Sequence, residues 1–417
     1  MIEVEVNKSS RALAQGKWYR RTKFHKFFAK MVRYFDRAIS NIYLEFKFRR
    51  QPIDDKKIMF LTSRGTYNCH PRAIADEIIR RKLPYKIIWV VRKENVVLNE
   101  VYPEEIETVR RGSYEFYQEA YSSKVWVDNS VTFSYLFAKK RPEQVLFQTW
   151  HGTFGLKKFD ASVNNNKYWV KKAYQEGAQT DYILTDCKFE EDLFCTTFWE
   201  KSEPLPYGHP RNDILFENHK EEADIIRKKV REYYQLAEDT HVLLFAPTYR
   251  DSSEFEYEEL DYERVADALT EKFGGEWVVM VRYHFLDRKV KGLAALGGRI
   301  INVTSYPDIQ DLMLVTDIAL TDYSSWIYDY FFTKKPGLIY APDLDDYVEK
   351  EREFLFPLES TPFAIAKNND QLIENIKNFD ENQYREKWQE FSDRMNCYED
   401  GNAAKRFVDK LEEIMGK

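Results

Sequence analysis

The sequence predicts an α/β protein with two doubly wound domains, because short apolar runs alternate with helix-like stretches in two successive series. Such alternation is typical of parallel sheets that are covered by helices on both faces. A segment rich in proline and glycine, Pro204–Asp213, lies between the two series and predicts a hinge there. We therefore expect two Rossmann-like halves that face each other across a cleft.

Each series is expected to contribute five strands. The strands predicted for the first series are Ile58–Thr62, Lys86–Val91, Lys124–Val127, Gln144–Gln148 and Tyr182–Leu184, with helices at Pro71–Lys82 and Tyr114–Ala120. The strands predicted for the second are His241–Ala246, Glu276–Val281, Arg299–Val303, Ile318–Thr321 and Gly337–Tyr340, with helices at Glu221–Gln235, Glu263–Phe273 and Ser325–Phe332. The expected domains are an N-terminal arm (1–50), an acceptor-side domain (51–208), a donor domain (209–395) and a C-terminal helix (396–417). Packing of this last helix against the N-terminal domain is one of the arrangements expected.

Length and composition exclude several classes of protein. The chain has 417 residues, 63 Lys+Arg and 69 Asp+Glu, which suits a globular protein of two or three domains. Its longest apolar runs are far shorter than the roughly 20 residues needed to cross a bilayer. The N-terminus lacks the apolar core of a signal peptide, and none of the four cysteines forms a CxxC pair. We expect a reduced, cytosolic protein.

The first 50 residues form a basic arm, with 13 Lys+Arg against 4 Asp+Glu. Apolar residues recur there at three- and four-residue steps, which predicts one face of an amphipathic helix. These residues are Phe24, Phe27, Phe28, Met31, Phe35, Ala38, Ile39, Ile42 and Phe46. Two interpretations stay open: a helix lying on an anionic inner leaflet, or a helix packed on the protein's own body. Nucleic acid is not expected as a partner, because the chain beyond the arm is acidic.

His151 is the first candidate for chemistry. It follows the predicted strand Gln144–Gln148 and precedes Gly152, at the edge where a parallel sheet binds its ligand. An imidazole with a near-neutral pKa can take a proton from a hydroxyl nucleophile. The alternative is a histidine that merely packs among loop groups.

The segment Thr321–Ser325 is the second candidate, between a predicted strand and a predicted helix. The hydroxyls of Ser324 and Ser325, together with free helix amides, can bind a phosphate or pyrophosphate. Asp329 lies four residues further on and can receive a polyol hydroxyl. The alternative is that these residues only cap or solvate the helix.

Cationic groups follow other strands and the hinge. They are Arg211, Arg250, Arg282 and His284. Arginine can hold two phosphate oxygens at once and stabilise charge in phosphoryl transfer, although a single one is more often part of an ion pair. No P-loop or zinc spacing is present, and the acidic cluster Asp343–Asp346 lacks the spacing of a calcium loop. The sequence therefore predicts no obligatory metal and no cofactor.

Several segments, taken in order, resemble the CDP-glycerol glycerophosphotransferases, the teichoic-acid and capsule polyol-phosphate transferases of bacteria. These segments are QTWHGTFGLKKFD, GHPRNDIL, FAPTYRD, VRYH, DIQDLMLVTDIALTDYSSWIYDYFFTKKP and CYEDGNAAKRFVD. The resemblance runs from about Ser63 to Val408 and implies a GT-B architecture. It implies transfer of a polyol phosphate from CDP-glycerol or CDP-ribitol, with release of CMP, to a lipid-linked or polymeric acceptor at the cytoplasmic face of the membrane.

The resemblance also implies roles for individual residues. His151 would be the base and His284 would contact the donor phosphate. Ser324 and Ser325 would bind the pyrophosphate, and Asp329 would contact the polyol. The remaining residues expected to bind the CDP-polyol are Arg211, Thr248, Arg250, Arg282 and Asp322.

The sequence departs from the family pattern at three places. His209 stands where the family usually has tyrosine, Arg352-Glu353 replaces an arginine–glycine pair, and the segment Tyr67–Pro71 differs. The properties that depend on these segments are the identity of the acceptor and the identity of the polyol. The alternatives are a GT-B glycosyltransferase that uses a nucleotide sugar, and a scaffold protein without activity.

Overall fold

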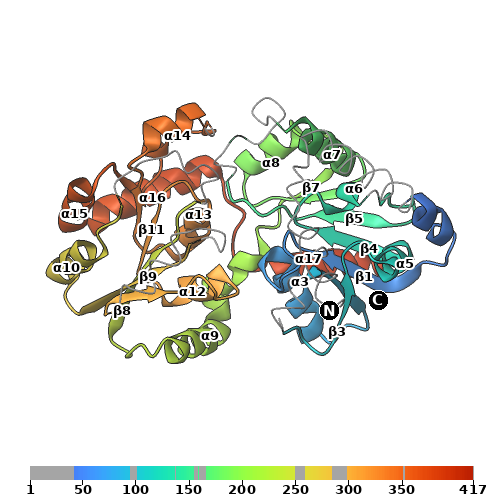
Figure 1. Ribbon diagram of the computed structural model, residues 1–417, viewed down its shortest axis with the longest axis horizontal. Helices are drawn as coiled ribbons and strands as arrows, with labels where there is room; N and C mark the ends of the chain where they lie inside the picture. Colours follow the sequence, from blue (N-terminus) through green and yellow to red (C-terminus); the bar gives the residue numbers. More distant parts are fainter. Residues whose placement is uncertain are drawn as a thin grey trace, which may run out of the picture.

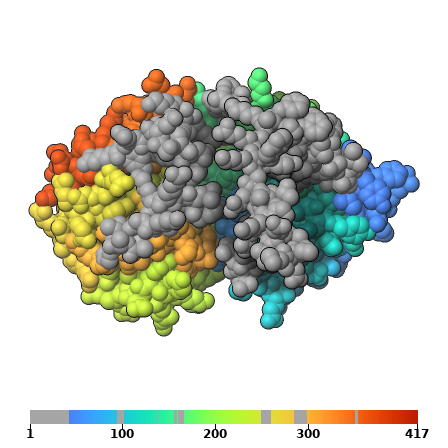
Figure 2. Space-filling view, viewed as in Figure 1, coloured from blue at the N-terminus to red at the C-terminus, as the bar shows by residue number. Residues whose placement is uncertain are grey.

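The computed structural model describes residues 42–93, 101–136, 138–154, 158, 166–248, 259–283, 298–350 and 353–416. Two α/β lobes stand side by side, each built on its own sheet (Figure 1). The space-filling view places the blue and cyan residues of the first half and the yellow and orange residues of the second half on opposite sides (Figure 2). The predicted fold class, two Rossmann-like halves, is confirmed.

The first sheet has seven strands in the order β3-β2-β1-β4-β5-β6-β7, and every pairing is parallel. Its strands are β1 (Asp54–Leu61), β2 (Lys86–Val91), β3 (Ile106–Arg110), β4 (Ser123–Asp128), β5 (Val145–Gln148), β6 (Tyr182–Leu184) and β7 (Glu203–Leu205). All five predicted strands are present. The sequence analysis missed β3 and β7 because both are edge strands: β3 is mostly polar and β7 has only three residues.

The second sheet has six strands in the order β10-β9-β8-β11-β12-β13, again all parallel. Its strands are β8 (Thr240–Phe245), β9 (Glu276–Val281), β10 (Ile300–Asn302), β11 (Ile318–Thr321), β12 (Gly337–Tyr340) and β13 (Ala364–Ala366). The five predicted strands are confirmed, and the three-residue edge strand β13 was missed. The strand order of both sheets is that of doubly wound folds, with the first strand of each series in the interior.

Helices cover both faces of each sheet. The helices of the first lobe are α3 (Cys69–Arg80), α5 (Tyr114–Ser122), α6 (Thr132–Tyr135), α7 (Lys167–Gly177) and α8 (Lys188–Cys195). Those that follow are α9 (Lys220–Tyr233), α10 (Tyr262–Phe273), α12 (Ile309–Val315), α13 (Trp326–Tyr330), α14 (Leu344–Lys350), α15 (Asn369–Lys377), α16 (Glu381–Met395) and α17 (Ala403–Met415). Short 3-10 turns lie at Pro210–Leu215 (η1), Glu217–His219 (η2), Phe331–Thr333 (η3) and Leu358–Ser360 (η4).

Strand alternation sorts the apolar side chains between two cores in each lobe. In β1, Ile58 and Phe60 face one core, whereas Met59 and Leu61 face the other. In the second lobe the alternate residues of β8 divide in the same way. Burial on both faces is the reason these strands have continuous apolar sequences.

The crossover between the lobes differs from the predicted hinge. Pro204 and Leu205 belong to β7, and the following residues from Gly208 to Asp213 are buried. The turn η1 contacts α3 and α17 of one lobe and α9 and α12 of the other. Proline and glycine therefore shape a packed crossover here, not an exposed linker.

The chain returns to the first lobe at its end. After α16, the segment leading to α17 pairs with the residues after β6, where the Tyr398 amide donates to the Asp186 carbonyl at 2.7 Å. Helix α17 then buries Phe407, Val408 and Leu411 against the core that contains Ile58 and Phe60. The carboxylate of Asp213 accepts hydrogen bonds from the first amides of α17, at 2.9 and 2.7 Å.

Most of the basic arm lies outside the described residues. Its described end is helical over residues 42–48, where Ile42 and Phe46 of the predicted apolar face are 61% and 69% exposed. Among the described residues, no helix is both long and apolar enough to cross a membrane.

Candidate active site

A cavity of about 530 Å³ lies where the carboxyl ends of the two sheets meet. The first lobe lines it with residues that follow β1, β4 and β5, and the second with residues that follow β8, β9 and β11. This is the edge at which parallel α/β sheets bind their ligands. Of the site residues predicted from the sequence, the cavity wall includes His151, Arg211, Thr248, Arg282, Ser324, Ser325 and Asp329.

His151 is held in a defined orientation at this wall. Its Nδ1 lies 2.6 Å from the backbone carbonyl of Asn129, the residue that follows β4. A carbonyl only accepts, so Nδ1 carries the proton and Nε2 keeps its lone pair. Burial between the lobes lowers the pKa of His151, and the charges of Arg211 and Arg64 lower it further. The imidazole is therefore neutral and suited to accept a proton.

The turn that carries His151 has an unusual backbone. Trp150 has a φ of +51°, a left-handed conformation that bulky residues seldom adopt. The Gln148 side chain stabilises the turn: its Oε1 accepts from the Trp150 amide at 2.8 Å, and its Nε2 donates to the Ser130 carbonyl at 2.6 Å. The Trp150 and His151 rings lie 4.6 Å apart. This network orients the imidazole relative to the sheet edge.

Arg211 and Asp329 form a buried ion pair across the two lobes. Arg211 Nη2 lies 2.8 Å from Asp329 Oδ2 and also donates to the Thr153 hydroxyl at 2.8 Å. Its Nη1 donates to the carbonyl of His151 at 2.9 Å. Burial disfavours the charge, but the Asp329 carboxylate raises the pKa of Arg211 above its ordinary value. Arg211 thus connects the His151 turn to the second lobe.

Asp329 has protein partners on both of its oxygens. Oδ1 accepts from the Thr153 hydroxyl at 2.5 Å, and Oδ2 lies 3.4 Å from Gln310 Nε2, within hydrogen-bond distance. Only 2% of this residue is exposed, so it is not the solvated helix carboxylate of the alternative interpretation.

The serine segment lies opposite, at the end of β11. The predicted helix Ser325–Phe332 is a five-residue α-helix, Trp326–Tyr330, continued by the 3-10 turn η3. Ser325 is its N-terminal boundary residue, yet its side chain makes no capping bond. Within the described part of the chain, neither the Ser324 nor the Ser325 hydroxyl has a hydrogen-bond partner. These hydroxyls are available to a ligand in the cavity.

Asp322 stabilises the wall of the cavity at the end of β11. Its Oδ1 accepts from the Thr248 amide at 2.8 Å, which joins the ends of β8 and β11. Arg282, at the end of β9, donates to the Tyr306 carbonyl at 2.6 Å, and burial lowers its pKa. It forms no ion pair with a carboxylate among the described residues. His284 and Arg250 lie outside the described residues.

The cavity also includes residues that the sequence analysis did not single out, among them Arg64, Asn129 and Gln310. Arg64 and Asn129 follow β1 and β4 within three residues of their ends, as His151 follows β5. A systematic search of polar residues after every predicted strand would have found these two. Gln310, on α12, gave no such signal.

Two parallel α/β sheets whose carboxyl ends share one polar cavity define the GT-B class of architecture. Within that class the chain belongs to the family described as CDP-glycerol:poly(glycerophosphate) glycerophosphotransferase, which it matches over residues 43–413.

The most similar solved structures include one of the wall teichoic acid polymerase TagF, with a TM-score of 0.79 and 27% identity over 93% of this chain and 98% of the other. A TagF variant soaked with CDPG has the same TM-score at 26% identity.

Among curated relatives, the teichoic acid poly(glycerol phosphate) polymerase of Staphylococcus epidermidis is 29% identical over 90% of this chain and 54% of its own length. The teichoic acid glycerol-phosphate transferase of Staphylococcus aureus is 28% identical over 89% and 96%. The chain thus spans about half the length of the first of these relatives and nearly all of the second.

Proposed function

We propose that this protein transfers a polyol phosphate, glycerol phosphate above all, from a CDP-polyol to a hydroxyl of a teichoic-acid or capsule acceptor, releasing CMP. The observation that carries this proposal is the placement around one cavity of a neutral, oriented imidazole and two serine hydroxyls that bond to no described residue, from different lobes. Family membership supports the same chemistry.

In the proposed reaction, Nε2 of His151 accepts the proton of the acceptor hydroxyl. The acceptor oxygen then forms a bond to the polyol-linked phosphorus, and the bond from that phosphorus to the bridging oxygen of CMP breaks. The electron pair of the broken bond leaves with CMP. General-base assistance of this kind contributes about two to four orders of magnitude in rate.

The second lobe would bind the diphosphate of the donor. Ser324 and Ser325 can donate hydroxyl hydrogen bonds to phosphate oxygens, and Arg282 adds positive charge at the end of β9, two strands away in the same sheet. His284 is expected to contact the same phosphates. The ion pair between Arg211 and Asp329 leaves Arg211 less suited to bind phosphate, so we assign it to positioning the His151 turn.

The experiment that tests this function is a panel of donors incubated with a synthetic lipid-linked acceptor and analysed by mass spectrometry. We expect CMP release and a product heavier by one glycerol phosphate. Release of UDP or GDP from nucleotide sugars would favour the glycosyltransferase alternative, and no release from any donor would favour a scaffold.

CDP-ribitol is the second donor to test. A teichoic acid ribitol-phosphate primase of Bacillus spizizenii is 30% identical over 66% of this chain and 71% of its own length. Turnover with CDP-ribitol that exceeds turnover with CDP-glycerol would reassign the polyol.

We further propose that the basic arm holds the enzyme at the anionic inner face of the bacterial cell membrane. The exposure of Ile42 and Phe46 leaves these two apolar side chains free for a membrane, while Leu44 and Phe48 of the same helix pack on the first lobe. Each cationic residue near such a surface contributes about 1 kcal/mol. Flotation with anionic liposomes should recruit the full chain but not a variant with the arm lysines changed to glutamine. Equal flotation of both would identify the arm as a structural helix.

A further inference from the structure

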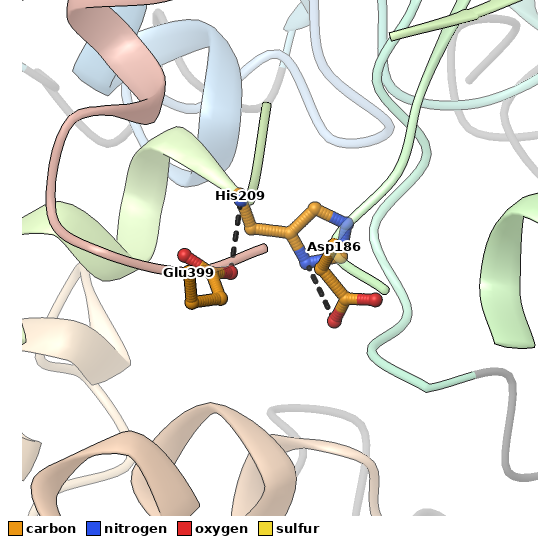
Figure 3. Close-up of side chains that lie close together, drawn as sticks. All are labelled: Asp186, His209 and Glu399. Atoms are coloured by element: carbon orange, nitrogen blue, oxygen red, sulfur yellow. Dashed lines mark hydrogen bonds and ion pairs between the residues drawn. The ribbon is translucent and has the colours of Figure 1, made fainter. Parts of the chain in front are cut away.

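A second polar cluster lies behind Arg211, at the crossover between the lobes. Asp186 follows β6, His209 follows β7, and Glu399 precedes α17 (Figure 3). One ligand atom from each of these three side chains lies within 4.8 Å of the other two. The figure shows the Asp186 carboxyl group beside the His209 ring and the Glu399 carboxyl group beside the His209 backbone amide, although the three residues come from distant parts of the chain.

Five polar side-chain atoms of this cluster lack hydrogen bonds, whereas Oε1 of Glu399 accepts from the His209 amide at 2.9 Å and from Asn212 Nδ2 at 3.1 Å. Both carboxyl oxygens of Asp186, both ring nitrogens of His209 and Oε2 of Glu399 are buried without a hydrogen-bond partner. Asp186 and His209 are each 0% exposed. An unsatisfied buried polar atom typically costs about 1–3 kcal/mol, so five of them in one place require an explanation.

One pair of these atoms, from His209 and Asp186, has the spacing of two ligands of one ion. His209 Nδ1 lies 3.5 Å from Asp186 Oδ2, which is long for a hydrogen bond. Two ligand atoms bound tetrahedrally at about 2.1 Å from one ion lie roughly 3.4 Å apart. The other oxygen of Asp186 or a water molecule would complete four ligands.

The surroundings of His209 match those of a metal-binding histidine. Glu190 Oε2 lies 3.1 Å from Nε2, on the side of the ring away from Asp186. A carboxylate in that position orients the ring of most metal-ligating histidines. Glu190 is itself fixed, because its Oε2 accepts from the Asp186 amide at 2.9 Å.

The charge of the cluster also favours a cation. Within the described part of the chain, no lysine or arginine forms an ion pair with Asp186, Glu190 or Glu399. The carboxyl groups of Asp186, Glu190 and Glu399 therefore share this buried region without a cationic side chain paired to them among the described residues. A divalent ion would supply the compensating positive charge.

We propose that Asp186, His209 and Glu399 form a structural binding site for one divalent transition-metal ion of the zinc class. Imidazole nitrogen with carboxylate oxygens is a ligand set that Zn²⁺ accepts. The ion would join the C-terminal segment to the crossover. It would also fix the segment of Arg211, two residues after His209, and so help to position the His151 turn.

The test measures metal content and stability, so its outcome is independent of transfer activity. The full chain is stripped with a chelator, dialysed against micromolar Zn²⁺ and analysed by elemental mass spectrometry. We expect one equivalent of zinc in the wild type and at least about tenfold weaker binding in Asp186→Asn and His209→Gln. Zinc should raise the unfolding temperature of the wild type, but not of these variants.

Glu176→Gln is the matched control, because it converts another fully buried carboxyl group, in the same lobe, to an amide. It should retain one equivalent of zinc. Two results would overturn the proposal: no zinc retained by the wild type, or equal zinc retention by wild type, Asp186→Asn and His209→Gln. Substitution with Co²⁺ provides a further check, since a thiolate charge-transfer band would assign the ion to the cysteines instead.

Discussion

The two walls of the cavity are built in opposite ways. On the wall formed by the first lobe and the crossover, the functional groups are already bonded within the protein: His151 to the Asn129 carbonyl, and Arg211 to Thr153 and Asp329. On the second-lobe wall, the hydroxyls of Ser324 and Ser325 bond to no described residue.

This difference suits two tasks. A base must be held in one orientation and one protonation state before its substrate arrives, which the first wall achieves through buried hydrogen bonds. A binding site for a charged donor needs donors that are still free to bond. We infer that the first lobe is arranged for catalysis and the second for recognition, and each prediction below tests that division.

The largest effect is expected at the base. His151→Ala and His151→Asn should each lower kcat for CMP release by about a hundred- to ten-thousandfold, because no group remains to accept the proton. The affinity for CDP-glycerol, measured by calorimetry, should stay close to that of the wild type. Near-normal turnover in either variant would remove His151 from the mechanism.

The ion pair behind the base should matter mainly for stability. Arg211→Met leaves the Asp329 carboxylate buried and unpaired, so the free energy of unfolding in urea should fall by about 3–5 kcal/mol. The double variant Arg211→Met/Asp329→Leu should lose less, because neither charge remains. A loss below about 1 kcal/mol in the single variant would indicate that the pair is effectively solvated.

The serine hydroxyls should matter for affinity alone. Ser324→Ala and Ser325→Ala should each weaken CDP-glycerol binding about ten- to 150-fold, since a hydrogen bond to a charged group contributes about 1.5–3 kcal/mol. Their unfolding free energies should match the wild type, because neither hydroxyl caps the helix. A loss of stability without a loss of affinity would contradict the assignment.

The acid limb of the pH profile should reflect the lowered pKa of His151. A base with a lowered pKa stays neutral as the pH falls, so kcat/KM should decline only below pH 6.5, the ordinary histidine value. If kcat/KM instead falls to half its maximum above pH 6.5, the pKa of His151 is not lowered by its surroundings.

A separate effect, on stability and its pH dependence alone, concerns the buried pair Asp128 and Glu176 behind the first wall. Burial and the neighbouring Asp128 raise the pKa of Glu176 from 4.5 to about 8. The folded protein therefore holds a proton that the unfolded chain releases, and stability falls as the pH rises from 4.5 to 8. Glu176→Gln should weaken this decline by at most about 1.4 kcal/mol per pH unit. An unchanged slope in urea unfolding would show that Glu176 is ionised when folded.

Much of the fold follows from local pattern. The ten predicted strands are present, and nearly all of them have apolar runs that are buried on both faces, a requirement that acts on each strand separately; the edge strand β10 is only partly buried. Strand β3 was missed because it is mostly polar, and β7 and β13 because each has only three residues. The site residues His151, Ser324 and Ser325 could be predicted because a parallel sheet directs every strand end to the same edge.

The sequence by itself determined the class of fold, the family, and the candidate base and donor-binding serines. These features depend on short segments and their order. Only the tertiary structure decided that Arg211 pairs with Asp329, that the supposed hinge is buried, and that Asp186, His209 and Glu399 meet. The reason is physical. Residues from separate lobes or distant segments come into contact only through the packing of the two sheets and of the returning helix α17, and the spacing of residues along the chain does not predict that packing.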